Sequence, residues 1–339
     1  MRQNVSAQRP NGQYLRQYLR RMDQVSEITR QAPTHERHTG QSRMSFRIPV
    51  VLIAVALLAA PPRPSRAPMQ HDTQGMAPGG LAELTPRGEV VRQASAATLS
   101  TDRRIRPYSA AILPNIDRVV VSTTDLDNGD TTRTLQFWRL SDLSVQHTIE
   151  LPSGPRGDEG YRSEEPRGPR VLRAGKSVLV STFNCGLYLL NDIAGTKPCA
   201  QLVASFPRKP GLPRTSCAVP AVVGNYYLIT VPAWSAVVSL DVSDPSHPRE
   251  VSRVTLGPDD VPHWIGIEPN SQRVVITGYQ GMRTRIVIAR FDERTGMLTL
   301  DERFRAAGST ETGLRMEGIA WPHGGRGAAV PHGAVFSRP

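Results

Sequence analysis

The stretch Arg118-Val-Val-Val-Ser-Thr123 decides the fold, because its pattern returns three times further along the chain. Each copy is a run rich in aliphatic and β-branched residues. Each comes after a turn containing Pro, Gly or Asn and precedes a second strand-like run. The later copies lie at 177–182, 226–231 and 273–278, and the second runs of the four units lie at 135–140, 187–190, 236–241 and 286–292.

The spacing of these copies predicts an all-β fold. The period is roughly 45–60 residues with about four short strands in each unit, which is typical of a β-propeller. A four-stranded antiparallel sheet cannot bury both faces alone, whereas sheets stacked one against the next bury them and leave only short edges. We therefore expect residues 101–339 to form a propeller of about five to seven four-stranded antiparallel blades, four of which are complete over roughly residues 105–304. The strand-like run 333–337 and a strand near Glu89 are expected to close the ring.

The composition agrees with many short strands joined by turns. The 339 residues are 39% hydrophobic and 21% charged, and they include 29 Pro and 28 Gly. Such a chain is too apolar to be disordered throughout, and too rich in Pro and Gly for a helical bundle or a membrane protein with many spans.

The net charge of +11 does not indicate a nucleic-acid partner, because the charge is unevenly placed. Residues 1–67 hold 11 of the 41 Lys and Arg residues but only 3 of the 30 acidic ones, which accounts for +8 of the total. The remainder of the chain is close to balanced, so we expect a small-molecule or protein partner and no nucleic acid.

The N-terminal region predicts export. Residues 1–43 are polar and are expected to be disordered or untranslated, with Met44 as the true start. Residues 44–67 resemble a signal peptide, because a short positive segment precedes the 13-residue apolar run 48–60. This run is shorter than the roughly 20 residues of a membrane span, so membrane attachment is expected only through an uncleaved signal anchor. Residues 68–100 are expected to be a linker, and the protein to be periplasmic or secreted.

Three cysteines lie beyond the signal segment, which leaves room for one disulfide in an oxidising compartment. Cys185 lies within a strand-like run, where the position of a partner is constrained. We therefore expect the bridge between Cys199 and Cys217. Cys185 is then either a small buried hydrophobic residue or a functional thiol.

Three histidines that come directly after a proline are the candidate metal ligands: His263, His323 and His332. His263 begins the first strand of its unit, and first strands line the centre of a propeller, where residues from different blades converge. Neutral imidazoles on rigid strands suit copper, iron or zinc, and Cys185 could join them if the metal is copper. The alternative is that these histidines only pack in turns and bond to neighbouring blades.

Acidic residues gather at 158–159 and 164–165, in a stretch rich in Gly, Pro and Arg between the first two units. Glu159 or Glu165 could serve as a ligand or base, since loops at propeller ends often form the binding face. The alternative is a solvated loop whose acids pair with Arg156, Arg162 and Arg167.

The sequence resembles the selenium-binding protein/methanethiol oxidase family. The resemblance rests on the Pro-His motifs, the Asn184-Cys185-Gly186 turn and the Asp-Val-Ser-Asp-Pro turn at 241–245. It implies a propeller fold and, from the oxidase members, copper held by histidines and the oxidation of a small thiol. In the family, adjacent histidines come after an acidic stretch, whereas here Gly160-Tyr161-Arg162 comes after Glu159.

Three functions are consistent with this pattern. The first is an exported propeller whose central histidines bind a transition metal and act on a small molecule by oxidation. The second is a propeller that binds a ligand or protein without catalysis, using loops such as 153–170. The third is a lactonase-like hydrolase, which would need carboxylate ligands for calcium or magnesium.

Overall fold

The computed structural model describes the backbone of most of the chain beyond residue 78. The described residues are 52–54, 79–95, 107–123, 133–152, 165–173, 175–206, 217, 219–269, 272–278, 284–317, 319–320, 326–327, 329–334 and 336. Apart from residues 52–54, the N-terminal segment 1–67 lies outside these residues, and so do the loop acids 158–159. Among the described residues, no helix has the length and apolar character of a membrane span.

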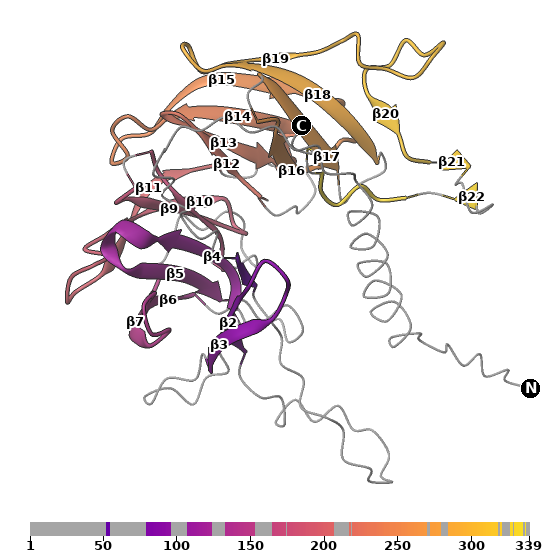
Figure 1. Cartoon of the computed structure of the whole chain (residues 1–339). Coiled ribbons are helices and arrows are strands. Elements are labelled where there is room, and N and C mark those ends of the chain that lie inside the picture. Colours follow the sequence, from indigo (N-terminus) through magenta and orange to yellow (C-terminus); the bar gives the residue numbers. More distant parts are fainter. Residues whose placement is uncertain are drawn as a thin grey trace, which may run out of the picture. The chain divides into compact units, whose positions relative to one another are not determined.

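Four antiparallel sheets of successive strands lie one after another along the chain, and we number them as blades 1 to 4 (Figure 1). Blade 1 consists of β4 (Pro107–Leu113), β5 (Arg118–Thr123), β6 (Thr134–Arg139) and β7 (Val145–Glu150). Blade 2 consists of β8 (Pro166–Val171), β9 (Val178–Thr182), β10 (Gly186–Asn191) and β11 (Cys199–Ser205). Blade 3 consists of β12 (Ala221–Val223), β13 (Tyr226–Val231), β14 (Ala236–Asp241) and β15 (Arg249–Thr255). Blade 4 consists of β16 (Pro262–Ile267), β17 (Arg273–Gly278), β18 (Arg285–Asp292) and β19 (Met297–Leu300).

Smaller elements complete the fold. The strand β20 (Leu314–Arg315) adds to blade 4 beside β18, and β21 (Ile319–Ala320) pairs with β22 (Arg326–Gly327). A three-stranded sheet comprises β1 (Leu52–Ala54), β2 (Gly80–Leu84) and β3 (Val90–Ser95), so that part of the segment expected as a linker forms a hairpin. Two short 3-10 helices, η2 (Pro114–Ile116) and η3 (Pro232–Trp234), serve as turns.

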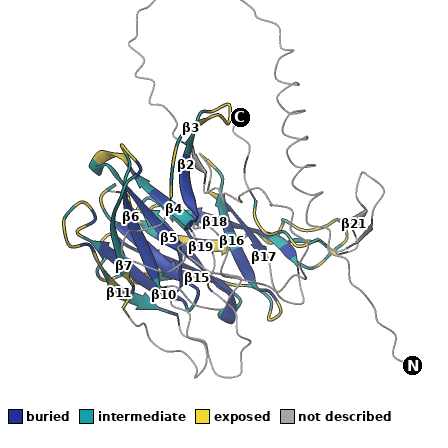
Figure 2. Cartoon of the chain, turned by 90° about the horizontal axis from the view of Figure 1, so that it is seen from below, coloured by how far each residue is buried: buried dark blue, intermediate teal, exposed yellow. Residues whose placement is uncertain are grey.

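Neighbouring blades pack against one another through layers of apolar side chains. Each of three buried clusters draws residues from two successive blades, as when Val120 of blade 1 packs with Val180 and Tyr188 of blade 2. The second and third strands are buried on both faces, which explains their uninterrupted apolar sequence (Figure 2). This arrangement confirms the predicted all-β propeller of four-stranded antiparallel blades.

The first strands β4, β8, β12 and β16 lie at the edges of their sheets and beside one another. Proline is tolerated there, because an edge strand leaves some N–H groups outside the ladder. The predicted Asp-Pro turn joins β14 to β15, where the carboxylates of Asp241 and Asp244 accept hydrogen bonds from the backbone N–H of Ser243 (2.9 Å) and Ser246 (3.0 Å).

Candidate functional site

A β-bulge occurs at the same place in the first strand of three blades. In blades 1, 2 and 4 a proline pairs with the second strand, the next residue is skipped, and pairing resumes one residue later. Such a bulge turns the skipped side chain away from the regular alternation of the strand. The three skipped residues are Tyr108, Arg167 and His263.

A second repeated contact fixes the backbone at this place. The hydroxyl of Ser122, in the second strand of blade 1, donates to the carbonyl of Arg167 in blade 2 (2.8 Å). Thr230, at the equivalent position of blade 3, donates in the same way to the carbonyl of His263 in blade 4 (3.5 Å). The bulged residue is therefore held by the preceding blade as well as by its own.

The C-terminal tail continues this pattern beyond blade 4. Thr277, the equivalent hydroxyl of blade 4, donates to the carbonyl of His332 (3.3 Å). The tail then runs so close to β16 that a Cβ on Gly266 would lie 2.8 Å from the carbonyl oxygen of Ala334. Pro331-His332 thus occupies, next to blade 4, the place that Pro262-His263 occupies next to blade 3.

The structure brings two of the three predicted histidines together. The ring centroids of His263 and His332 lie 4.7 Å apart at an interplanar angle of 49°. His263 is buried, His332 is exposed, and the ring of Trp264 lies 6.4 Å from that of His332. Burial lowers the pKa of His263 to about 3, helped by the positive charge of Arg167 and by His332, so its ring is neutral at physiological pH.

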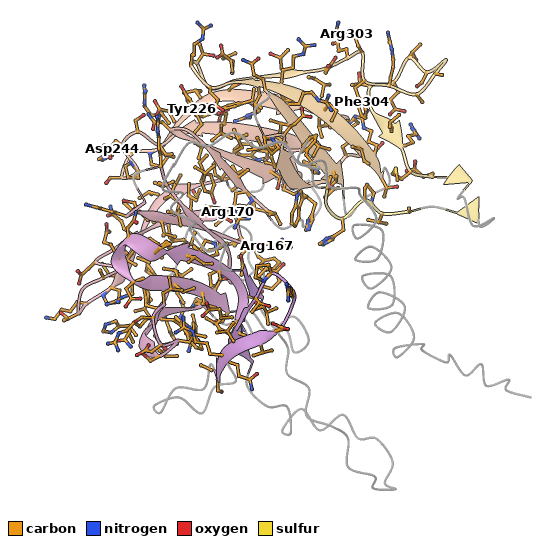
Figure 3. The ribbon with its side chains drawn as sticks, in the orientation of Figure 1. Arg167, Arg170, Tyr226, Asp244, Arg303 and Phe304 are labelled. Carbon is orange, nitrogen blue, oxygen red and sulfur yellow. A yellow bond between two sulfur atoms is a disulfide. The ribbon has the colours of Figure 1, made fainter. Side chains whose placement is uncertain are left out.

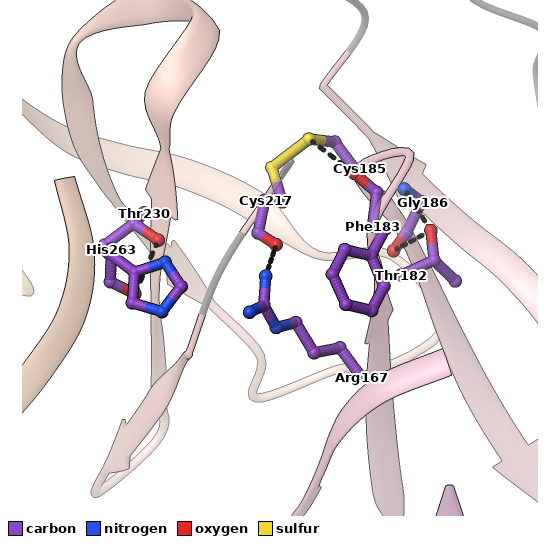
Figure 4. The surroundings of a disulfide bond; sticks show 8 residues. All are labelled: Arg167, Thr182, Phe183, Cys185, Gly186, Cys217, Thr230 and His263. Carbon is purple, nitrogen blue, oxygen red and sulfur yellow. Dashed lines mark hydrogen bonds between the residues drawn. A yellow bond between two sulfur atoms is a disulfide. The ribbon is translucent and has the colours of Figure 1, made fainter. Parts of the chain in front are cut away.

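Arg167 is buried, and Figure 4 shows its guanidinium between the rings of His263 and Phe183. Its Nη1 donates to the carbonyl of Cys217 (2.9 Å) and its Nη2 to the hydroxyl of Tyr108 (3.4 Å). The guanidinium carbon lies 4.2 Å from the centroid of Phe183, a cation–π contact. We call Tyr108, Arg167, His263 and His332 the inner cluster.

The disulfide joins Cys185 to Cys217, so the predicted Cys199–Cys217 pairing is wrong. Cys185 lies in the turn after β9, at a positive φ of 63°, and its Cα is 5.0 Å from that of Cys217. The strand-like run around Cys185 is thus broken by a turn that faces the chain entering blade 3. Cys199 begins the outermost strand of blade 2 and is exposed.

The disulfide contacts the inner cluster through Cys217. The carbonyl of Cys217 accepts from Arg167, and its N–H donates to the carbonyl of Phe183 (3.1 Å). Two residues later, the N–H of Val219 donates to the carbonyl of His263 (2.9 Å). Because its sulfur is bonded, Cys185 offers no thiolate to a metal, and the expectation that it serves as a ligand is wrong. The segment that the disulfide anchors positions both Arg167 and His263.

The remaining sequence-predicted site residues divide in two. His323 and Glu159 lie outside the described residues. Glu165 and Arg167 are both buried, at 7% exposure each, so the prediction that they belong to a solvated loop is wrong. They lie just before and within β8, an edge strand of blade 2.

The described side chains do not by themselves fit a metal ion. Among them, no three His, Cys, Asp or Glu side chains gather as potential ligands. The imidazole of His263 also lies within reach of the positive charge of Arg167, which opposes a cation. A metal would need a further ligand from outside the described residues.

Sequence reasoning missed Arg167 and Tyr108 as site residues, although a signal was present. The Pro-His motifs mark the bulged position, and Pro107-Tyr108 and Pro166-Arg167 mark the same position with other side chains. Aligning the first strands on their proline and comparing the next residue, whatever its type, would have found both.

Comparison with known proteins identifies the fold. No family model matches the chain, and no curated protein matches its sequence. Its structure is similar to that of a hypothetical selenium-binding protein from Sulfolobus tokodaii, with a TM-score of 0.55 and 15% identity, over 71% of this chain and 62% of that one. It is also similar to a periplasmic gluconolactonase from Pseudomonas aeruginosa, with a TM-score of 0.49 and 11% identity, over 66% of this chain and 62% of that one.

At these identities the similarity shows the propeller fold alone. The chain spans 62% of the length of the Sulfolobus protein. The specific resemblance to the selenium-binding protein family therefore stays a prediction.

Proposed function

We propose that this chain is a propeller that binds a small molecule at the inner cluster. One observation carries the proposal: four segments far apart in sequence bring Tyr108, Arg167, His263 and His332 together. A repeated bulge positions the first three, and a repeated hydroxyl–carbonyl contact positions the last three. A few polar groups that converge among aromatic rings are typical of small-molecule sites. The exposed ring of His332 connects the buried part of the cluster to solvent.

Export is part of the same proposal. The buried Cys185–Cys217 disulfide supports it, because disulfides persist in oxidising compartments and are rare in the cytosol. The signal-like segment 44–67 supports it from the sequence side.

A transition-metal site is a second candidate, favoured by the 4.7 Å approach of the rings of His263 and His332. It requires His323 or another group outside the described residues as a third ligand, and copper is the metal that the sequence resemblance implies. The oxidation of a small thiol depends on this candidate. A lactonase-like reaction would need several carboxylates, and no group of three such ligands gathers in the described part of the chain.

A thermal-shift screen tests the proposal. The full chain is screened against neutral, anionic and cationic small molecules and against copper, zinc and iron salts, next to a His263→Gln/His332→Gln variant. We expect at least one class to raise the Tm of the wild type and to lose most of that effect in the variant. His247→Gln is the matched control, because the side chain of His247 is 82% exposed on the β14–β15 turn.

The outcomes separate the candidates. A Tm shift by a metal salt alone, with near-stoichiometric metal by mass spectrometry that the double variant loses, would select the metal site. Equal shifts in the wild type and the double variant, or no shift with any probe, would overturn the proposal and direct the search to the loop face.

A further inference from the structure

Two arginines on β8, the buried Arg167 and the half-buried Arg170, have only neutral hydrogen-bond partners among the described residues. Among the described residues, Arg167 donates to the carbonyl of Cys217 and the hydroxyl of Tyr108, and no carboxylate pairs with it. Arg170, three residues further on, donates from Nε to the carbonyl of Pro220 (2.9 Å) and from Nη1 to that of Pro169 (3.0 Å). Both arginines belong to the first strand of blade 2 (Figure 3).

Such an arrangement is costly without an anion. A buried charge is normally paired, because carbonyl dipoles replace only part of the hydration that a guanidinium loses. Burial lowers the pKa of Arg170, which reflects this cost. The positive charge of Arg167 on β8 is therefore available to pair with the negative charge of a bound ligand.

The side chains around Arg167 suit an anion and oppose a cation. His263 is neutral, so it can donate a hydrogen bond to an oxyanion without adding the cost of a second buried charge. The rings of Tyr108 and Phe183 flank the guanidinium and supply apolar surface. Arginine has a planar fork of donors that matches the two oxygens of a carboxylate.

We propose that the ligand of the inner cluster is a small carboxylate, with Arg167 as its charge partner and His263 and His332 as neutral hydrogen-bonding groups. The inference rests on the proposed function, since it names the chemical class that this site takes. The protein's own Glu165, buried two residues before Arg167, is the internal carboxylate that the test must separate from an added ligand.

The test uses three probes of one shape and different charge on the full chain: benzoate, benzamide and benzylamine. We expect calorimetric titration to show that benzoate binds at least about tenfold more tightly than benzamide, because the neutral amide lacks the charge-assisted hydrogen bond to Arg167. We expect benzylamine, which is positively charged, not to bind. This comparison uses the wild type only, so it does not depend on whether any variant folds.

Variants then locate the charge partner. We expect Arg167→Gln to lose benzoate binding by at least about tenfold and Arg167→Lys to keep part of it, with circular dichroism confirming the fold. Arg294→Gln is the control, because the side chain of Arg294 is 89% exposed on blade 4. Glu165→Gln should not weaken benzoate binding, because Glu165 is not among the described partners of Arg167.

The inference and the proposed function fail in different ways. If benzamide or benzylamine binds in a manner that depends on His263 and His332 while benzoate does not, the carboxylate is wrong and the binding site stands. Benzoate binding that Arg167→Gln leaves intact would also overturn the inference. If no probe in the wider screen binds through the histidines, the proposed function itself is wrong.

Discussion

A proline and a bulge together explain how one position in each repeat can carry a binding side chain. Proline suits the start of an edge strand because it has no N–H to leave unpaired. The bulge after it releases the next side chain from the regular alternation. At this position the repeats carry Tyr108, Arg167 and His263, and the tail presents His332. The repeated backbone thus sets the place, and the residue type at each copy sets the chemistry.

The buried imidazole of His263 makes the stability of the fold depend on pH. Its pKa is about 3 in the folded protein, against 6.5 for an ordinary histidine, because of burial, Arg167 and His332. The folded state therefore binds fewer protons than the unfolded state between these values. The stabilising contribution is present above pH 6.5 and is lost as the pH falls from 6.5 toward 3.

We expect wild type to lose stability over this pH range faster than His263→Gln, whose side chain does not titrate. Urea unfolding of both proteins at several pH values between about 7 and about 4 measures the difference in their free energies of unfolding. The carboxylates titrate in both proteins, so their contribution to the pH dependence cancels in this difference. His247→Gln, altered at an exposed site, should keep the wild-type dependence. Parallel curves for wild type and His263→Gln would contradict the prediction.

At the scale of elements, the second and third strands could be predicted from sequence, whereas among the first strands only the one that begins near His263 was predicted. β5, β9, β13 and β17 are buried on both faces, so each reads as an apolar run between turns. β8 reads Pro-Arg-Gly-Pro-Arg-Val, with two prolines and no alternation, because an edge strand tolerates what an inner ladder does not.

The part of the site that sequence reasoning misses has the same cause. The sequence pattern places Arg167 in a loop because it does not reveal the strand that carries this residue. The histidines can be found from sequence because their residue type is distinctive. The disulfide pairing cannot, because contacts between a turn of one blade and the entry to the next leave no mark in local sequence.

One element of blade 4 depends on a buried ion pair. Arg285, at the start of β18, donates from Nε to Asp260 (2.8 Å) and also donates to the carbonyl of Thr312. The side chains of Arg285 and Asp260 are 8% and 4% exposed, so the pair is shielded from water. Through Arg285, the loop before β16, which holds Asp260, is connected to the segment before β20, which holds Thr312.

We expect Asp260→Asn to reduce the free energy of unfolding by about 3 kcal/mol, because it removes the closer of the two carboxylates that face the buried guanidinium and leaves only Glu311, 3.6 Å from Nη1 of Arg285. The control is Glu250→Gln, which breaks the pair with Arg253 at a surface where the two side chains are 38% and 34% exposed; its cost should stay below about 1 kcal/mol. Urea unfolding measures both. Similar losses for the two variants would mean that the Arg285 pair is not the anchor of this segment.

At the scale of the whole molecule, repeat sheets need a cover at the end of the stack. A blade with an uncovered apolar face is prone to aggregation, and atypical terminal units normally cover it. Here the β2–β3 hairpin packs Leu81 against Val119, Val121 and Trp138 of blade 1. Arg92 of the hairpin adds a hydrogen bond to the carbonyl of Leu140 (2.7 Å). The hairpin is thus the cover of blade 1, within a segment whose composition resembles a linker.

Two N-terminal truncations test this role, because they differ by the hairpin alone. A chain that starts at residue 79 keeps β2 and β3, whereas one that starts at residue 97 exposes the apolar face of blade 1. We expect the shorter chain to have a lower Tm and to aggregate, as measured by light scattering during heating. In the full chain, Leu81→Ala should cost about 2–5 kcal/mol, since the side chain is fully buried. Val91→Ala, at a site 57% exposed on the same hairpin, should change stability by less than about 0.5 kcal/mol. Equal stability of the two truncated chains would show that blade 1 needs no cover, and the hairpin would then be an appendage rather than part of the stack.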